Sequence, residues 1–408
     1  MNSIIQTNPY VLVDSEAKDK LSNKLTGEKI LCGDKIIELV NFLKAPRAYE
    51  SIEQEFSEIK EQLPQVIDAL LAKKFLLKPD QLEEAVTTIT PCTPHLFNLP
   101  FFSKSKKNEI NDKGIVFVGV PLGIGNKTNQ TASYYPNALR NYSEKYGIKL
   151  NSGSNFNVKS FGPKNNYQNL QTLINEGRLF DIGNMFFDLN ESPDFCYEKV
   201  ESIARDLFKE SEKQIPFFVG GDHSISYPLI KAAVDEFGDD LCVIHFDAHT
   251  DTYGSPYNQI KHGKKIHHHG NFLTKCFENG LKHAYQFGIR GMVNSNQSDN
   301  NEFQTIYWSG ETKELIKSGH LFDELPKDKK YYVTFDFDVL DPLFFAGTTT
   351  PVINGFTLEE CQYLINHVIK GRDIVGVDVV ELYTDKGDIG VTHQIAIQFI
   401  LDLLNAIA

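Results

Sequence analysis

Short apolar runs alternate with helix-like segments along nearly three quarters of the chain, from residue 114 to residue 408. A short, uninterrupted apolar run is typical of a strand that is buried on both faces. Strands that alternate with helices indicate a parallel sheet. We therefore expect residues 113–408 to form a doubly wound, mostly parallel α/β sheet flanked by helices. The runs that predict its strands are IVFVGV, LFDIG, IPFFVGG, LCVIHF, AYQFGIR, TIYWSG, KYYVTFDF and IVGVDVVELY.

The first 85 residues have a different pattern. Two strand candidates, YVLV and KILC, precede three helical patterns, DKIIELVNFL, YESIEQEFSEI and PQVIDALLAKKFLL. In the first helix, apolar residues recur at the spacing of one helix face. We expect residues 1–85 to form a small α+β domain of winged-helix size. Residues 86–112 carry three prolines and a polar end, and we expect them to be a linker.

Composition and charge narrow the class of protein. A hydrophobic content of 41%, including 12% aromatic residues, is ample for a core. The formal net charge of −13 argues against a nucleic-acid partner, because no basic domain offsets phosphate repulsion. No apolar run approaches the roughly 20 residues that span a bilayer, and the N-terminus does not resemble a signal peptide. The six cysteines are scattered and include no CxxC pair, so we expect a cytoplasmic protein with reduced thiols and no membrane partner.

Four predicted strands end in side chains that can bind metal ions. Carboxyl ends of parallel strands meet at one edge of a sheet, where so many carboxylates would repel one another without a cation. Aspartate oxygens combined with histidines suit a divalent ion such as Mn²⁺, and there are enough carboxylates for two ions. The residues at these ends are Asp222, His223, Asp247, His249, Asp251, Asp336, Asp338, Asp341, Asp378 and Glu381.

Each strand end also has a simpler interpretation, because aspartates often cap helices or shape turns. We assign Asp341, which precedes a proline, to a turn, and Asp222 and Asp378 to structural support. For the remaining residues the occurrence of DAHTD, GGDHS and DFDVLDP in one α/β domain favours metal binding.

Residues from about 114 to 408 resemble the ureohydrolase superfamily of arginases and agmatinases. The motifs GGDHSIS, DAHTD, TFDFDVLDP and GVDVVEL occur in the family's order. VGVPLG, YYPNALR, FGIRG and GVTHQIAI frame them. The resemblance implies an arginase-like fold, hydrolysis of a guanidino group to urea and an amine, and assembly as a homo-oligomer.

The resemblance also implies two Mn²⁺ ions per chain. Asp247 and Asp336 would bridge them, and Asp247 would thereby share in catalysis. The ligands of the first ion would be His223, Asp247, Asp251 and Asp336. Those of the second would be Asp247, His249, Asp336 and Asp338.

Two further residues match catalytic positions of the family. Glu381 corresponds to the carboxylate that receives the guanidinium. His269, in HHHGNFL, corresponds to a histidine at the mouth of the site that can shuttle a proton. Its neighbours His267 and His268 leave this match open by a residue or two, and the alternative for either neighbour is a solvated loop histidine. His245 shares a strand face with Asp247 and is expected to support the ligands.

The substrate is less clearly indicated. Arginases for free arginine follow DAHTD with an asparagine-containing loop, whereas this chain has Tyr253 near that place, a candidate substrate-binding residue. AGTTTP, residues 346–351, replaces the family's Pro-Gly-Thr-Gly-Thr-Pro, which we expect to alter the loop and not the ligands. The N-terminal unit is similar in element order to leader-recognition domains of enzymes that modify ribosomally made peptides; an oligomerisation or lid appendage is the alternative.

These features favour a peptide arginase of ribosomal peptide natural product biosynthesis. Its reaction is Mn²⁺-dependent hydrolysis of arginine side chains in a precursor peptide, which gives peptidyl ornithine and urea. One alternative is a small-molecule ureohydrolase that acts on agmatine, a guanidino acid, arginine or a formimidoyl compound. A second alternative is a non-catalytic scaffold with the arginase fold.

Overall fold

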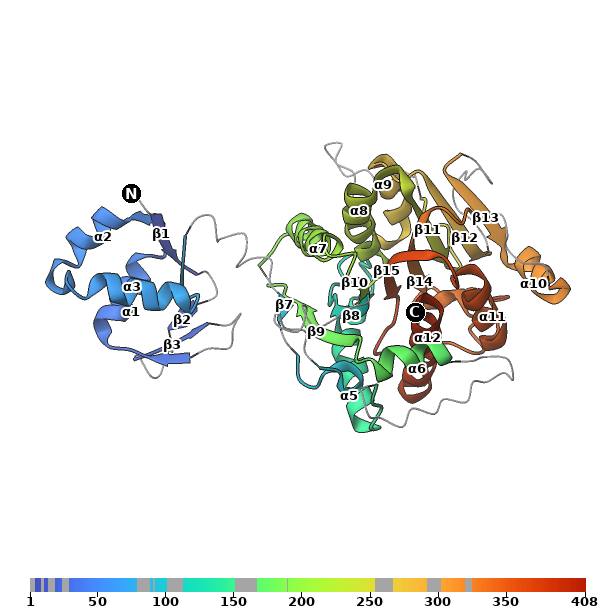
Figure 1. Cartoon of the computed structure of the whole chain (residues 1–408), viewed down its shortest axis with the longest axis horizontal. Coiled ribbons are helices and arrows are strands. Elements are labelled where there is room, and N and C mark those ends of the chain that lie inside the picture. Colours follow the sequence, from blue (N-terminus) through green and yellow to red (C-terminus); the bar gives the residue numbers. More distant parts are fainter. Residues whose placement is uncertain are drawn as a thin grey trace. The chain divides into compact units, whose positions relative to one another are not determined.

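The computed structural model divides the chain into two compact units, Met1–Thr90 and Pro91–Ala408 (Figure 1). The residues that the structure describes are 4–8, 11–13, 19–23, 29–78, 89–90, 92–100, 113–150, 167–188, 190–253, 267–291, 302–319 and 325–408.

Within the described residues, the N-terminal unit contains two small antiparallel sheets and three α-helices. The helices lie where the hydrophobic pattern predicts them, except that the third ends at Ala72 and Leu76–Leu77 form a strand. Both sheets are three-stranded, with the orders β5-β1-β6 and β2-β3-β4. The strands are β1 (Ile4–Thr7), β2 (Val11–Val13), β3 (Lys20–Asn23), β4 (Lys29–Leu31), β5 (Arg47–Ala48) and β6 (Leu76–Leu77). The helices are α1 (Asp34–Phe42), α2 (Tyr49–Glu55), η1 (Ser57–Ile59) and α3 (Leu63–Ala72). The similarity to a winged helix stays a prediction.

A single apolar cluster holds this unit together. Leu39 and Val40 of α1 and Ile67 of α3 are buried in it. The helical spacing of these residues therefore predicts their faces correctly. Strand β4 lies at one end of its sheet, where Ile30 packs against the cluster and Leu31 is 77% exposed.

The second unit is built on one large sheet. Every strand predicted from the apolar runs is present, and all pairs between β8 and β15 are parallel. The order of its strands is β13-β12-β11-β14-β15-β10-β8-β9. A short strand, β7 (Ile89–Thr90), ends the first unit. The strands are β8 (Gly114–Gly119), β9 (Leu179–Met185), β10 (Gln214–Val219), β11 (Leu241–Phe246), β12 (His283–Ile289), β13 (Gln304–Trp308), β14 (Lys330–Asp336) and β15 (Asp373–Val380).

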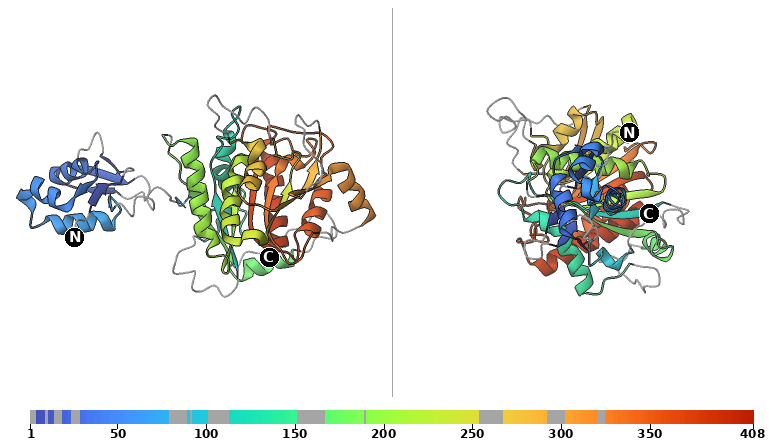
Figure 2. Two further views of the ribbon diagram at one scale, coloured as in Figure 1. Left: turned by 90° about the horizontal axis from the view of Figure 1, so that it is seen from above. Right: turned by 90° about the vertical axis from the view of Figure 1, so that its left-hand side faces the viewer.

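Helices cover both faces of this sheet (Figures 1 and 2), which confirms the predicted doubly wound α/β fold. Phe335 of β14 stacks on Phe399 of one layer, with ring centroids 5.7 Å apart. Tyr332 of the same strand meets Phe208 of the other layer edge-on at 6.3 Å. The first layer contains η5 (Thr131–Tyr134), α5 (Tyr135–Lys145), α6 (Gln168–Asn175), α10 (Ser309–Ser318), α11 (Leu358–Val368) and α12 (Ile389–Ile407). The second contains α7 (Pro193–Phe208), α8 (Ser226–Phe237) and α9 (Phe272–Glu278).

Helix α12 is long and apolar enough to cross a membrane by length and composition, with a mean hydropathy of 1.2. It is not an uninterrupted apolar run, because His393, Gln398 and Asp402 lie within it. In addition, 72% of this segment is buried inside the unit, where Phe399, Ile400 and Leu403 join the core. The helix is apolar on most sides because it packs between the sheet and neighbouring helices.

Part of the segment expected to be a linker belongs to the core of the second unit. Leu96 and Phe97 lie on η3 (Leu96–Asn98) and are fully buried. The Leu96 N–H donates to Asp181 Oδ2 at 2.6 Å, and the Phe97 ring meets Phe117 edge-on at 6.0 Å. The linker expectation for residues 86–112 therefore does not describe residues 92–100. The flanking prolines indicated a connector, but they bracket an apolar Leu-Phe-Asn-Leu stretch.

Candidate active site

The GGDHS segment turns sharply from β10 into η6 (His223–Ile225). A Cβ on Gly221 would lie 1.7 Å from the Leu122 carbonyl oxygen, so this close approach requires glycine. Asp222 caps η6 by accepting from the Ser224 N–H at 2.9 Å, and its other oxygen accepts from the Gly125 N–H at 2.8 Å. The structural role predicted for Asp222 thus fits its contacts, and His223 is directed to the edge of the sheet.

Three carboxylates converge on Nδ1 of His223. This atom lies 3.1 Å from Asp247 Oδ2, 3.1 Å from Asp251 Oδ2 and 3.2 Å from Asp336 Oδ2. It is buried, yet within the described part of the chain it makes no hydrogen bond to any of them. A buried nitrogen that is surrounded by carboxylate oxygens without bonding to them fits a cation site.

The tautomer of neutral His223 strengthens this interpretation. The Thr334 hydroxyl donates to Asp378 Oδ1 at 2.6 Å, so it accepts from His223 Nε2–H at 2.9 Å. In the neutral ring, Nδ1 then directs a lone pair at the three carboxylates, which repel it. Burial alone lowers the pKa of His223, but these carboxylates raise it well above its ordinary value. Without a metal ion the site takes up a proton, and a cation would take the proton's place.

A second group of ligand atoms adjoins the first. His249 Nδ1 lies 3.1 Å from Asp338 Oδ2 and 3.4 Å from Asp247 Oδ1. Asp247 therefore directs one oxygen at each histidine, as a bridging ligand would. Asp336 faces only the first group in the described contacts, because its Oδ1 accepts from the Asp338 N–H at 2.7 Å.

The charges of these carboxylates are unbalanced without a cation. Burial, followed by the charges of Asp338 and Asp247, raises the pKa of Asp336 well above its ordinary value. Burial and the Asp247 charge raise the pKa of Asp338 in the same way. A pair of divalent ions would let all of these carboxylates stay ionised.

His245 supports the ligands, as the sequence suggested. The Gln286 Nε2 donates to the Thr250 carbonyl at 2.8 Å and to His245 Nδ1 at 2.9 Å, which fixes the orientation of the amide. His245 Nε2 therefore carries the proton and donates to Asp247 Oδ2 at 2.8 Å. Since both ring nitrogens are engaged, His245 orients Asp247 and has no lone pair left for a metal ion.

Two site residues have strained backbones. Asp251 has φ 49° and Glu381 has φ 59°, both in the left-handed region that favours glycine. Such conformations cost roughly 1–3 kcal/mol and persist where surrounding contacts hold them, often at functional sites.

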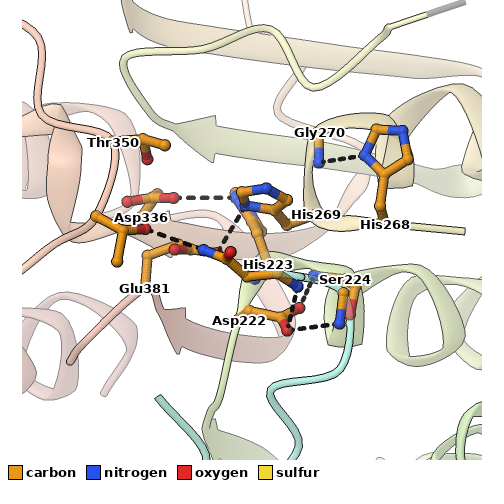
Figure 3. Close-up of polar contacts among 12 residues, drawn as sticks. Asp222, His223, Ser224, His268, His269, Gly270, Asp336, Thr350 and Glu381 are labelled. Carbon is orange, nitrogen blue, oxygen red and sulfur yellow. Dashed lines mark hydrogen bonds and ion pairs between the residues drawn. The ribbon is translucent and has the colours of Figure 1, made fainter. Parts of the chain in front are cut away.

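Glu381 follows β15 and lies against His223 and His269 (Figure 3). Its Oε1 accepts from the His223 backbone N–H at 2.8 Å and lies 3.3 Å from His269 Nδ1. Burial lowers the pKa of His269, but Glu381 raises it more strongly, to about 9. Burial raises the pKa of Glu381, and His269 brings it below its ordinary value. In the free protein the two side chains thus form an ion pair.

The two neighbours of His269 have other contacts. The Gly270 N–H donates to Nδ1 of His268 at 3.2 Å, so this side chain caps η9 (His269–Asn271) and lies apart from Glu381 (Figure 3). His267 Nε2 donates to the Ser224 carbonyl at 2.7 Å, and its ring packs edge-on against Tyr197 at 4.4 Å. A solvated loop position is therefore wrong for His267, because its apolar and backbone partners come from α7 and η6.

Tyr253 lies beside the segment that carries His269. Its N–H donates to the Gly270 carbonyl at 3.1 Å, and a Cβ on Gly270 would lie 3.0 Å from its ring. Residues 254–266 of the loop that distinguishes this chain from arginases lie outside the described residues. The role of Tyr253 in substrate binding stays a prediction.

The AGTTTP loop contributes contacts that sequence reasoning did not foresee. The Thr350 hydroxyl donates to Asp338 Oδ2 at 3.1 Å, so the loop touches a candidate ligand. The Tyr383 hydroxyl donates to Glu381 Oε2 at 2.7 Å. Thr350 matches the second threonine of the family motif, so the departures at Ala346 and Thr349 gave no signal for its contact with Asp338. Nothing in the sequence indicated the Tyr383 contact either.

A parallel α/β sheet with a buried histidine and aspartate cluster at its carboxyl edge defines an enzyme scaffold able to hold metal ions. Residues 113–405 match the family model described as "Arginase family", and the chain belongs to this family. It is a ureohydrolase, which hydrolyses a C–N bond of a guanidino group, and not a non-catalytic scaffold.

Known relatives agree with this assignment. An agmatinase of Klebsiella pneumoniae is 27% identical over 299 residues, which cover 72% of this chain and 87% of that enzyme. The structure of proclavaminate amidino hydrolase from Streptomyces clavuligerus matches with a TM-score of 0.61 at 24% identity, over 78% of this chain and 97% of that one. The arginase of Medicago truncatula matches with a TM-score of 0.58 at 19% identity, over 74% and 92%. The two structures support the fold alone.

Proposed function

We propose that the protein hydrolyses the guanidinium group of arginine side chains in a precursor peptide and releases urea and peptidyl ornithine. The observation that carries the hydrolytic part is the buried carboxylate of Glu381, held 2.8 Å from the backbone of His223 at the edge of the cation cluster. A buried carboxylate beside a metal cluster is suited to bind a planar cation and present its carbon to the metal site.

Two Mn²⁺ ions fit the ligand atoms, because carboxylate oxygens and two imidazoles suit a divalent ion of intermediate softness. His223, Asp247, Asp251 and Asp336 would hold one ion, and His249, Asp338 and the shared Asp247 and Asp336 the other. When bound, the ions supply Lewis acidity and lower the pKa of water toward neutrality.

Glu381 has limited capacity for the guanidinium in the free protein. Its two oxygens offer about four acceptor positions. Three are occupied, by the His223 N–H, by His269 Nδ1 and by the Tyr383 hydroxyl. A two-pronged guanidinium contact therefore requires His269 to leave Oε1. The cationic substrate replaces the cationic histidine at the same carboxylate, so the charge of the pocket is conserved.

His269 is then free to act on the leaving group. Its pKa of about 9 in the free protein means that it carries a proton at neutral pH. In the free protein its side chain is 28% exposed, so the ring can move away from Glu381 towards solvent when the guanidinium binds. We assign it the delivery of a proton to the nitrogen that departs as the ornithine amine. The attacking water provides the oxygen of urea.

The peptide part of the proposal rests on the N-terminal unit. Within the described residues, β4 has a neighbouring strand on one side only. The Cys32 N–H donates to the Asp19 carbonyl of the β3 side at 2.7 Å. Because amide directions alternate along a strand, the Leu31 N–H points away from β3. An exposed Leu31 side chain and a free strand edge suit an extended leader peptide that adds as a further strand.

A pair of variants tests this edge. Leu31→Pro removes the outward N–H and leaves the β3–β4 hydrogen bonds intact, whereas Leu31→Ala keeps the N–H and serves as the matched control. We expect Leu31→Pro to slow conversion of a full precursor peptide at least tenfold more than Leu31→Ala does, with no change for a peptide that lacks the leader. Equal rates for both variants on the full precursor would reject leader binding at β4.

The second candidate is a small-molecule ureohydrolase, which the similarity to agmatinases favours. It predicts that agmatine is hydrolysed with a higher kcat/KM than any arginine-containing peptide. The competition among agmatine, free arginine and peptide in one urea assay separates the two candidates.

The proposal also covers the cellular location and the oligomeric state of the enzyme. All six cysteines are free thiols, which suits a cytoplasmic enzyme. We expect a homo-oligomer, which sedimentation velocity of the full chain tests: a monomer at micromolar concentration would contradict it.

A further inference from the structure

Tyr383, which the ureohydrolase motifs do not include, forms a hydrogen bond to Glu381, the carboxylate proposed to bind the guanidinium. The Tyr383 hydroxyl donates to Glu381 Oε2 at 2.7 Å, and Tyr383 is 1% exposed. We propose that Tyr383, supported by Asn126 and Thr349, is a positioning residue that fixes Glu381 for the guanidinium. The inference rests on the proposed ureohydrolase site.

The hydrogen bonds from Asn126 to Tyr383 and from Tyr383 to Glu381 form a relay. Two backbone N–H groups set its direction. Oδ1 of Asn126 accepts from the Thr128 N–H at 3.1 Å and from the Asn129 N–H at 3.2 Å, so the amide cannot be reversed. Nδ2 of Asn126 therefore donates to the Tyr383 hydroxyl at 2.8 Å and to the Thr349 hydroxyl at 3.0 Å. With one lone pair filled by Asn126, the tyrosine directs its own proton to Glu381.

The relay matters most when substrate is bound. Once the guanidinium displaces His269, the remaining protein donors to Glu381 among the described contacts are the His223 N–H on Oε1 and the Tyr383 hydroxyl on Oε2. One donor on each oxygen fixes the plane of the carboxylate. A fixed plane aligns the guanidinium with the cluster and avoids the entropy of a rotating acceptor.

One partner of Asn126 in these contacts departs from the family motif. Thr349 stands where the family motif Pro-Gly-Thr-Gly-Thr-Pro has its second glycine, which has no hydroxyl to accept from Asn126. The same loop is tied to the tyrosine by the Tyr383 N–H, which donates to the Gly347 carbonyl at 2.9 Å. The altered loop thus joins the residues that follow β15 to the segment around Asn126.

Tyr383→Phe in the full, Mn²⁺-loaded chain tests the inference. The substrate is whichever of precursor peptide, free arginine and agmatine the wild type hydrolyses fastest. Loss of one hydrogen bond to a charged group predicts a fall in kcat/KM of about 10- to 100-fold. Bound Mn²⁺ should stay unchanged. Asn126→Ala should cost little more in the Tyr383→Phe background, because both residues act through one path.

Tyr331→Phe is the matched control. It removes the hydroxyl of another buried tyrosine, which donates to the Pro326 carbonyl at 2.5 Å. Tyr331 lies near the start of β14, whereas the candidate metal ligand Asp336 lies at its end. Its Tm should fall with kcat/KM unchanged. If Tyr383→Phe behaves like this control, Tyr383 is structural and the inference is overturned.

Thr349→Gly, which restores the family residue, covers the case in which Tyr383→Phe does not fold. The inference predicts a two- to tenfold loss in kcat/KM for this variant, and an unchanged value contradicts it. A wild type that releases no urea from any guanidino compound would instead reject the proposed function itself.

Discussion

The Glu381 carboxylate accepts a hydrogen bond from the backbone N–H of His223 at 2.8 Å, across 158 positions of sequence. The side chain of the same His223 faces Asp247, Asp251 and Asp336. One residue therefore fixes the distance between the proposed cation cluster and the proposed guanidinium acceptor. This coupling explains why both functions lie at the ends of neighbouring strands, β10 and β15.

Removing the charge of Glu381 should strongly reduce turnover without loss of the bound metal ions. Glu381→Gln keeps the shape and still accepts from the His223 N–H, but it loses the charge that attracts the guanidinium. We expect kcat/KM to fall at least about 100-fold, since charge-assisted contacts of this kind are worth roughly 1.5–3 kcal/mol each. Metal analysis should find the same Mn²⁺ content as in the wild type. A variant with near-normal urea release would show that another group binds the guanidinium.

His269→Gln should slow the chemical step more than substrate binding. A positioned proton donor typically contributes about 10²- to 10⁴-fold, so we expect a loss of this size in kcat with a smaller change in KM. Added imidazole should restore part of the rate, because the His269 side chain is 28% exposed. His268→Gln is the control, since His268 bonds to Gly270 and not to Glu381. Equal losses in the two variants would argue against a proton-transfer role.

Metal ions should stabilise the fold as well as support activity. Four buried carboxylates surround the two histidines, and bound cations relieve their repulsion without the uptake of protons. At a hundredfold excess over Kd, Mn²⁺ should add about 2.7 kcal/mol of stability per bound ion, or roughly 4 °C in Tm for a domain of this size. Thermal unfolding with EDTA and with Mn²⁺ measures this shift. Asp247→Ala should remove most of it; a full shift in that variant would reject the bridging role of Asp247.

Asp402, far along α12 from the site, should make stability depend on pH. Burial raises its pKa to about 6, even though Gln362 donates to it at 2.9 Å. Because the folded pKa lies above the unfolded value of about 3.9, its contribution is present below pH 4 and is lost as pH rises to about 6.

Asp402→Asn should therefore be more stable than the wild type at pH 8, by roughly 1–3 kcal/mol. The difference should shrink towards pH 4, which urea unfolding in EDTA at both pH values measures. A difference that is the same at both pH values would show that Asp402 does not titrate in this range.

The sheet was predictable because its strands are buried on both faces and read as uninterrupted apolar runs, such as Val243, Ile244 and Phe246 of β11. The convergence of His223, Asp247 and Asp336 was predictable for a related reason: parallel strands place all carboxyl ends at one edge. The motifs then indicated which polar residues would meet there.

Other features depend on tertiary contacts that leave no local pattern. Asn126 and Tyr383 bond across 257 positions of sequence, and neither belongs to a motif. Leu96 and Phe97 enter the core although prolines flank them, and His267 is held by partners from α7 and η6. Hydrophobic spacing reports which face of an element is buried, but it does not report which distant element covers that face.

The most direct test of the central claim is the mass of a peptide after incubation with the Mn²⁺-loaded chain. The substrate is an arginine-containing precursor peptide, with agmatine and free arginine in parallel reactions and urea measured in all three. The proposal predicts that the peptide loses HN=C=NH at each converted arginine, with one urea per loss, and that Asp336→Ala abolishes both signals. Urea from agmatine with an unchanged peptide mass would contradict the peptide substrate and leave a small-molecule ureohydrolase.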